Sequence, residues 1–355
     1  MPTLHPARPA GLLLPVLLAA CADPLDDNSA LITEERLLAV VARPAEVAPG
    51  ATQTLTGLWA GPEGLIGEAA LGWGVCRRPK PLAELGPAAP DCLEAENSAL
   101  ESLPAGPTAS LTVPEDACSL FGPNPPPPVE GEEAGRPADP DVTGGFYQPV
   151  AVFAPEAAEG EIAAGIASLR LRCDLANVSQ ETYIAWNAGY HDNLAPEIES
   201  LELEVDGAPI EVARDGGEAT APVPAGAAVG LRLAWPECPL EAACGDGVCS
   251  GGETGEACAE DCGAGGLGCA GAETYVVQVP GTDTLELARE SVSVAWFTTA
   301  GAFDAPRGGR AADDAARMVD AEWSAPTTPG EVLVVAVLRD SRGGASALSL
   351  TLTVE

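Results

Sequence analysis

The sequence predicts an all-β protein made of two antiparallel sandwich domains, the second with a small disulfide-rich insertion. Three observations predict it. Apolar and polar residues alternate in short runs at the period-two spacing of half-buried strands. Clusters of glycine, proline and aspartate separate these runs at regular intervals, as turns do in β-sandwiches. Long helical periodicity is nearly absent, and only 311–319 is expected to form one or two helical turns.

The first domain is expected over 35–194. Its candidate strands are 35–41, 51–59, 71–76, 109–113, 146–153 and 166–173. The segment 122–141 holds four consecutive prolines and a cluster of acids. Such a composition cannot build a core, so this segment is expected to be a long exposed loop.

The strand pattern restarts after Pro196, and the second domain is expected over 195–355. Leu201, Leu203 and Val205 share one face of the first strand, and Asp206-Gly207 is a hairpin turn signal. Further strands are expected at 208–212, 227–235, 275–279, 285–287, 291–298, 332–338 and 345–354, with the last two joined by a hairpin turn over 340–344.

The N-terminus is typical of an exported chain. Residues 1–20 contain Arg8 and a short apolar run that ends in small residues, the layout of a secretory signal peptide. Leu18-Ala19-Ala20-Cys21 resembles the lipobox of bacterial lipoproteins, in which the peptide is cut before a lipidated cysteine. The resemblance implies a membrane anchor at Cys21 and, because Ala22 follows, an outer-membrane or cell-surface address. Residues 21–34 are expected to form a polar tether.

The net charge of the chain limits the classes of partner that the protein is expected to bind. The chain has 53 acidic and 17 basic residues, a formal net charge of −36. This balance argues against binding to nucleic acid and against electrostatic attachment to anionic lipid. No segment after the signal peptide is long and apolar enough to span a membrane.

The number of cysteines is consistent with an exported chain. Eleven cysteines are present, and ten remain once Cys21 is assigned to lipid. An even number in an exported chain predicts disulfides. The ten are Cys76, Cys92, Cys118, Cys173, Cys238, Cys244, Cys249, Cys258, Cys262 and Cys269. We expect Cys76 to pair with Cys92 and Cys118 with Cys173, although ten cysteines allow many patterns.

The segment 238–269 is interpreted as a disulfide-stapled insertion, with Cys238–Cys269 closing its base. Zinc would need thiolates, which an oxidising compartment disfavours, and redox chemistry lacks a C-x-x-C motif or a nearby basic residue. Its acids could supply oxygen ligands to calcium, or could only keep the loop soluble. These acids are Asp246, Glu253, Glu256, Glu260 and Asp261.

No catalytic residue is predicted. After the signal peptide the only histidine is His191, and no G-x-S-x-G motif accompanies it. The G-x-G-x-x-G at 263–268 lacks the strand before it and the helix after it that phosphate binding requires. The six tryptophans are interpreted as core anchors rather than a sugar-binding platform, because most lie in candidate strands.

Two resemblances add to this interpretation. The second half resembles bacterial immunoglobulin-like domains, through 196–198, 293–303, 323–330 and 337–344. The whole chain is similar to myxobacterial and related deltaproteobacterial surface lipoproteins with a CGDGVC-type cysteine-rich segment. These resemblances imply the fold and the surface address. From the sequence as a whole we expect a surface lipoprotein with a non-catalytic binding, adhesion or envelope-structural role, and an envelope protein or polysaccharide as partner. A polysaccharide-binding accessory lipoprotein and an uncharacterised secreted hydrolase stay open as alternatives.

Overall fold

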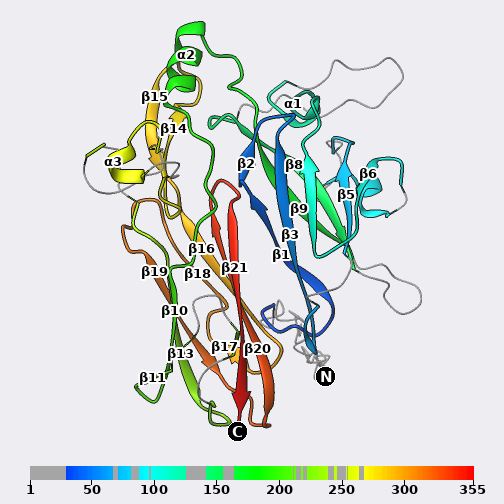
Figure 1. The fold of residues 1–355 in the computed structure, drawn as a ribbon, viewed down its shortest axis with the longest axis vertical. Helices are drawn as coiled ribbons and strands as arrows, with labels where there is room; N and C mark the ends of the chain where they lie inside the picture. Colours follow the sequence, from blue (N-terminus) through cyan, green and yellow to red (C-terminus); the bar gives the residue numbers. More distant parts are fainter. Residues whose placement is uncertain are drawn as a thin grey trace, which may run out of the picture.

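Strands dominate the computed structural model, which confirms the prediction of an all-β protein (Figure 1). The structure describes residues 29–66, 71–80, 88–95, 97–124, 141–154, 164–210, 212, 217–218, 222–238, 244–245, 253, 255–263 and 268–355. The predicted signal peptide, Cys21 and most of the proline-rich loop therefore lie outside the described residues.

The first sandwich, called sandwich 1 below, consists of strands β1 to β9. One sheet has the order β1 (Arg36–Arg43), β3 (Thr52–Gly61) and β4 (Gly64–Leu65), with β7 (Thr108–Thr112) also paired to β3. The other has the order β2 (Glu46–Val47), β9 (Ala164–Arg172), β8 (Gly145–Phe153), β5 (Gly72–Cys76) and β6 (Leu100–Leu103). Leu55, Trp59, Leu111 and Val150 are among the side chains buried between these sheets.

The second sandwich, sandwich 2, consists of β10 to β13 and β16 to β21. One sheet has the order β11 (Ala208–Ile210), β10 (Ser200–Val205), β13 (Ala228–Ala234), β19 (Met318–Ser324) and β17 (Ala302–Phe303). The other has the order β12 (Gly217–Glu218), β21 (Ala345–Val354), β20 (Gly330–Asp340), β16 (Val292–Thr298) and β18 (Arg307–Arg310). The predicted alternation holds, since Leu201, Leu203 and Val205 all point into the core.

The two sandwiches share one topology. In sandwich 1, β1, β3 and β7 form one sheet, while β9, β8 and β5 form the other with β2 parallel to β9. In sandwich 2, β10, β13 and β19 correspond to the first set, and β21, β20 and β16 to the second with β12 parallel to β21. Immunoglobulin domains place the first, second and fifth of their seven main strands in one sheet and the third, sixth and seventh in the other. Both sandwiches have this arrangement. The predicted immunoglobulin-like fold is therefore confirmed by the strand order.

Few helices accompany the sheets. Among the residues that the structure describes, they are η1 (Pro90–Leu93), α1 (Ala117–Phe121), α2 (Gln180–Gly189) and α3 (Ala259–Cys262). Ser179 caps α2 by accepting a hydrogen bond from the Thr182 N–H at 3.2 Å. Beside α2 lies a separate hairpin of β14 (Thr274–Gln278) and β15 (Leu285–Arg289) (Figure 1). In the described part of the chain, no helix is long and apolar enough to cross a membrane.

Two expectations need correction. The segment 311–319 forms a turn and then enters β19, not a helix, because its last residues pair with β13 in the sheet. Residues 29–34 do not behave as a free tether. Ile32 is 1% exposed, its N–H donates to the Thr298 carbonyl at 2.8 Å, and the Thr298 N–H donates to the Ala30 carbonyl at 2.9 Å. Burial of Ala30 and Ile32 where the sandwiches meet is favourable, because it removes their apolar side chains from water.

Candidate functional site

The disulfides confirm the predicted pairs. Cys76 bonds to Cys92, Cys118 to Cys173 and Cys238 to Cys269. Within the insertion, a fourth bridge joins Cys244 and Cys258, and Cys262 is also disulfide-bonded. Cys249 lies outside the described residues. The bridged sulfurs are not thiolates, so they do not offer the ligands that zinc requires.

The acids of the insertion serve different purposes. Asp261 accepts a hydrogen bond from the Gly245 N–H at 2.5 Å, which ties α3 to the start of the insertion. Ligand atoms of Glu253, Cys258 and Asp261 lie within 4.8 Å of one another, but the sulfur belongs to a disulfide. Calcium takes about six to eight oxygens. Asp246 lies outside the described residues, so the calcium site stays a prediction.

The sandwiches meet through an apolar contact. Leu38 and Ala60 from sandwich 1 pack with Ile32 against Leu333 and Val335 of β20. The alternate residues of β20 fill the core of sandwich 2 instead. Both faces of β20 are therefore buried, which explains why its sequence is a continuous apolar run without alternation. Figure 1 shows β1 and β21 side by side along this contact.

Above the apolar contact lies a buried polar cluster, which we call the junction network. It contains four carboxylates, two arginines and an asparagine, each at most 8% exposed: Glu46, Arg170, Asn193, Glu273, Glu290, Asp340 and Arg342. Groups of this kind are rarely buried without partners, because the loss of hydration is costly. The network is accordingly densely hydrogen-bonded.

The half of the network in sandwich 1 centres on Glu46, which begins the short strand β2. Its carboxylate pairs with Arg170 of β9, with Arg170 Nε 3.1 Å from Oε2. The same oxygen accepts a hydrogen bond from the Asn193 N–H at 2.8 Å, and the Tyr190 hydroxyl donates to Oε1. Arg170 also donates to the Thr143 hydroxyl at 2.8 Å. Sandwich 1 thus holds the segment that leaves α2.

The half in sandwich 2 centres on Arg342, in the turn between β20 and β21. Its Nε donates to Glu290 at 2.6 Å, and its Nη2 donates to Glu273 at 2.8 Å. The Leu194 N–H donates to the same Glu273 oxygen at 3.0 Å. The Glu273 N–H in turn donates to Glu290 at 3.0 Å. Because Glu273 precedes β14 and Glu290 follows β15, Arg342 fixes the base of that hairpin to sandwich 2.

Asn193 and Asp340 connect the two halves. The Asn193 side-chain amide donates to Asp340 Oδ2 at 3.1 Å, while Asp340 Oδ1 accepts from the N–H groups of Arg342 and Gly344 at 2.8 Å each. A Cβ at Gly344 would lie 2.2 Å from Asp340 Oδ2, so only glycine fits there. The Tyr147 hydroxyl donates to the Arg342 carbonyl at 3.3 Å, a further link between the sandwiches.

The network has more acid than base. Burial raises the pKa of Glu290 to about 7, against the opposing effect of the Arg342 guanidinium. Burial, followed by the negative charge of Glu290, raises the pKa of Glu273, and burial raises that of Asp340. Glu273 Oε1 has no hydrogen-bond partner among the described residues. The arrangement can therefore hold a proton near neutral pH.

His191 lies at the edge of the network and contacts a backbone carbonyl. Its Nε2 is 2.7 Å from the Thr274 carbonyl oxygen, which can only accept, so Nε2 carries the proton. Burial, and then the nearby Arg342 charge, lower the pKa of the imidazole and keep it neutral. Of the G-x-G-x-x-G segment, 264–267 lies outside the described residues.

The sequence pattern predicts almost nothing of the network. Its partners are 2 to 147 residues apart in the chain, and no motif joins them. One signal was available. Arg170 stands between Leu169 and Leu171 in β9, and a charged residue inside an apolar strand indicates a buried ion pair.

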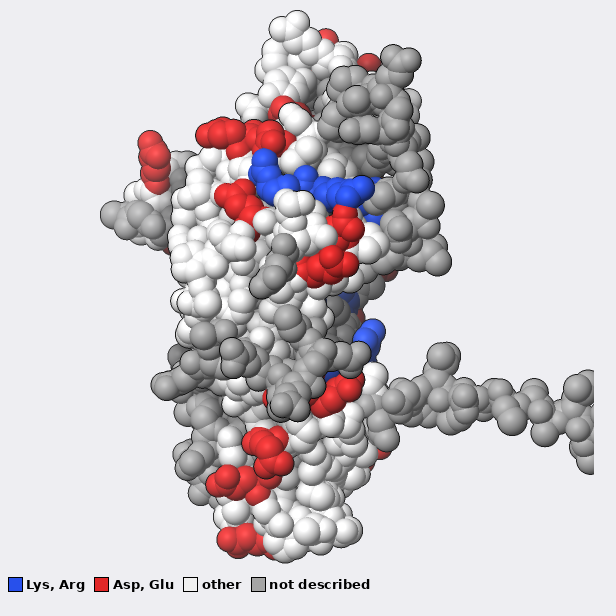
Figure 2. Space-filling view, turned by 90° about the vertical axis from the view of Figure 1, so that its right-hand side faces the viewer, with Lys and Arg blue, Asp and Glu red and all other residues white. Residues whose placement is uncertain are grey.

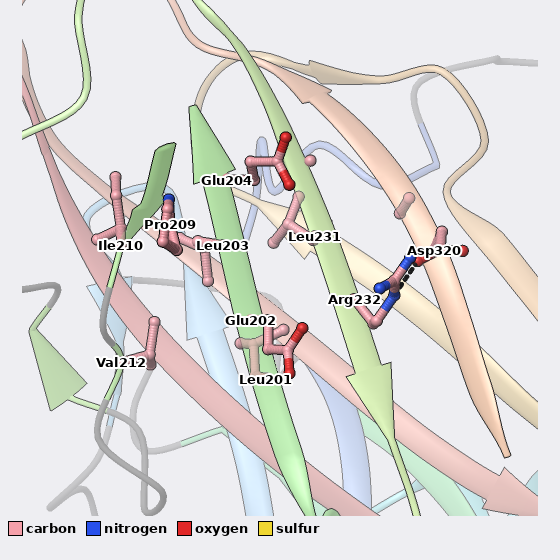
Figure 3. Close-up of a pocket in the computed structure, with 12 residues that line it drawn as sticks. Leu201, Glu202, Leu203, Glu204, Pro209, Ile210, Val212, Leu231, Arg232 and Asp320 are labelled. Carbon is pink, nitrogen blue, oxygen red and sulfur yellow. Dashed lines mark hydrogen bonds and ion pairs between the residues drawn. The ribbon is translucent and has the colours of Figure 1, made fainter. Parts of the chain in front are cut away.

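Two surface features lie outside the junction. A hollow of about 610 Å³ on sandwich 2 is lined by Glu202 and Glu204 of β10 and by the Arg232–Asp320 ion pair at 2.7 Å (Figure 3). Figure 2 shows a short basic strip among acidic side chains on one face. Some exposed arginines have acidic partners; Arg78, for example, forms an ion pair with Asp91. All six tryptophans are buried, as predicted for core anchors, at 3% exposure or less.

Comparisons with known proteins give weak likenesses only. No family model and no curated protein matches the chain. Dimeric latent PorU of Porphyromonas gingivalis is similar at 12% identity and TM-score 0.20, over 90% of this chain and 34% of its own. Adhesin InvE of Yersinia pseudotuberculosis gives 12% and 0.18, over 88% and 58%.

The Ig1-2 module of the Drosophila receptor protein tyrosine phosphatase DLAR gives 10% identity and TM-score 0.18, over 91% of this chain and 99% of its own. The chain thus spans about a third and just over half of the lengths of PorU and InvE. At these TM-scores the fold assignment rests on the strand topology of the chain itself.

Proposed function

We propose that the protein is an exported, lipid-anchored surface protein with a non-catalytic binding, adhesion or envelope-structural role. The observation that carries the proposal is the junction network. It joins two immunoglobulin-type sandwiches into one unit, and its buried charges are directed at one another rather than into a cavity. A stiff two-domain unit suits the display of a binding surface, because it loses little conformational entropy when a partner binds.

Export and anchoring rest on two supports. The disulfides of both sandwiches suit an oxidising compartment. The sequence of 1–21 resembles a lipoprotein signal, so Cys21 is the proposed anchor and the outer membrane or cell surface the proposed address. A polybasic membrane contact or a nucleic-acid partner is not part of the proposal, because the net charge is −36.

The alternatives have less support. A sugar platform built from tryptophan has no basis here, since all six tryptophans are buried. A hydrolase would need a base or a carboxylate pair open to substrate. His191 is held by a carbonyl, and the three acids around Arg342 are at most 8% exposed.

Anchoring is tested by metabolic labelling with palmitate in the native host. The wild-type protein should take up label and fractionate with outer membranes, while the Cys21→Ser protein should lose both properties. Label retained by Cys21→Ser would contradict the anchor.

Binding is tested separately with purified, fluorescently labelled Cys21→Ser protein added to isolated envelopes. Saturable binding that protease treatment of the envelopes removes would identify a protein partner. Loss after periodate treatment instead would favour the polysaccharide alternative. Absence of saturable binding, together with release of soluble products from envelope polymers, would replace the proposal with the hydrolase alternative.

A further inference from the structure

We propose that the junction network is a proton-controlled latch, in which the charge on Glu273, Glu290 and Asp340 around Arg342 sets how tightly the sandwiches hold the segment between them. The segment is 190–199, which runs without helix or strand from α2 to β10. This regulation goes beyond the proposed surface role and does not require it, although both rest on the junction network.

The segment 190–199 is held by hydrogen bonds to the carboxylates of the network. The Asn193 N–H donates to Glu46 of sandwich 1, and the Leu194 N–H donates to Glu273 at the base of the hairpin. The Asn193 side chain donates to Asp340 of sandwich 2. Consecutive residues are thus held by carboxylates from three different parts of the fold. Any change that moves these carboxylates releases the segment.

The charge around Arg342 does not balance when every acid is ionised. Three carboxyls, each at most 8% exposed, surround one guanidinium, and the other buried arginine is paired with Glu46. The remaining neighbours cannot restore balance. Arg43 faces Asp340, but it is exposed and donates to the Ala345 carbonyl, so solvent screens its charge. His191, which faces Arg342, is neutral and adds no charge.

The other titratable neighbours are Tyr147, Tyr190 and Tyr275, whose pKa values burial raises, and Asp192, which pairs with exposed Arg172. The tyrosines therefore stay neutral through the physiological range. Asp192 adds negative charge rather than relieving it. The closed network consequently requires a proton to avoid an uncompensated buried charge.

Glu273 and Glu290 are the groups that share this proton. Burial raises both of their pKa values, that of Glu290 to about 7. Both carboxyls accept from Arg342, and the negative charge of Glu290 raises the pKa of Glu273, so a proton taken up here is shared between the two acids. Glu273 Oε1, which lacks a partner among the described residues, has a lone pair to which the proton can bind.

The sign of the pH effect follows from the raised pKa. A carboxyl that binds its proton more tightly in the closed junction than in the open one stabilises the closed form below its ordinary pKa. That stability is lost as pH rises through the raised value, here about 7. The latch should therefore be tight at mildly acidic pH and loosen above neutrality.

Hydrogen exchange measured by NMR on the full-length Cys21→Ser protein tests the latch. The amides of Asn193 and Leu194 report on the junction, and the Val334 amide in β20 serves as an internal reference. After correction for intrinsic exchange, the protection of the two junction amides should fall by up to about tenfold per pH unit above neutrality, the slope for release of one proton. Protection of Val334 should change much less.

Glu273→Gln provides the matched variant, because its carbonyl can accept from Arg342 and Leu194 while the charge is removed. Its junction amides should show a nearly flat pH profile, whereas Asp320→Asn, at the exposed pair with Arg232, should keep the wild-type slope. An unchanged slope in Glu273→Gln would overturn the latch. So would a flat profile in the wild-type protein, which decides the question even if the variant does not fold.

Discussion

Arg342→Met is expected to destabilise the protein strongly and in a pH-dependent way. Arg342 is 1% exposed and donates to Glu290 at 2.6 Å and to Glu273 at 2.8 Å. Methionine can fill much of the space of the arginine stem but leaves two buried carboxyls without a cation. Removing one partner of a buried ion pair costs about 3–5 kcal/mol. At alkaline pH the loss should reach this range, or on the order of 10 °C in Tm.

The loss should shrink at about pH 5, because both acids can then take up protons and no charge is stranded. Urea unfolding followed by tryptophan fluorescence at the two pH values measures it. Arg232→Met, which breaks only the exposed pair with Asp320, is the control and should change stability little at either pH. A loss below about 1 kcal/mol at alkaline pH, or equal losses at both pH values, would refute the reasoning about the junction.

Three further changes test the packing. Leu38→Ala, at a junction side chain 5% exposed, should lower the unfolding free energy by about 2–5 kcal/mol in urea titrations; a loss under 1 would mean the apolar contact is loose. Gly144→Ala places a Cβ 2.3 Å from the Trp186 ring at a residue with φ +75°. Gly281 has nearly the same φ, +73°, but open space around it, so the Tm of Gly144→Ala should fall well below that of Gly281→Ala. Equal Tm values would contradict this. Replacing Cys118 and Cys173 together by alanine should cost about 4 kcal/mol in the same titrations for a separation of 55 residues, and no loss would count against the bridge.

The fold could be predicted because its signal is local. Leu201, Leu203 and Val205 alternate with polar residues, and Asp206-Gly207 forms the expected turn with φ of +50° and +78°. The segment 311–319 was misassigned because its alanines favour helix, whereas pairing of its end with β13 is a tertiary effect. Local propensity cannot anticipate a partner strand about 85 residues earlier in the chain.

The junction network could not be predicted for a related reason. Glu46 and Asn193 are 147 residues apart, and acids like Glu46 occur 53 times in the chain, so nothing marks the buried ones. Burial of a charge is decided by which surfaces of two domains meet. The apolar run of β20 did contain a hint, since a strand buried on both faces requires a second partner.

A stiff junction would hold the two sandwiches in one fixed arrangement. Small-angle X-ray scattering of the Cys21→Ser protein at mildly acidic pH tests it most directly. We expect a single arrangement of the sandwiches, the one in Figure 1, to fit the whole scattering curve. A curve that requires an ensemble of widely different arrangements at that pH would contradict a stiff junction.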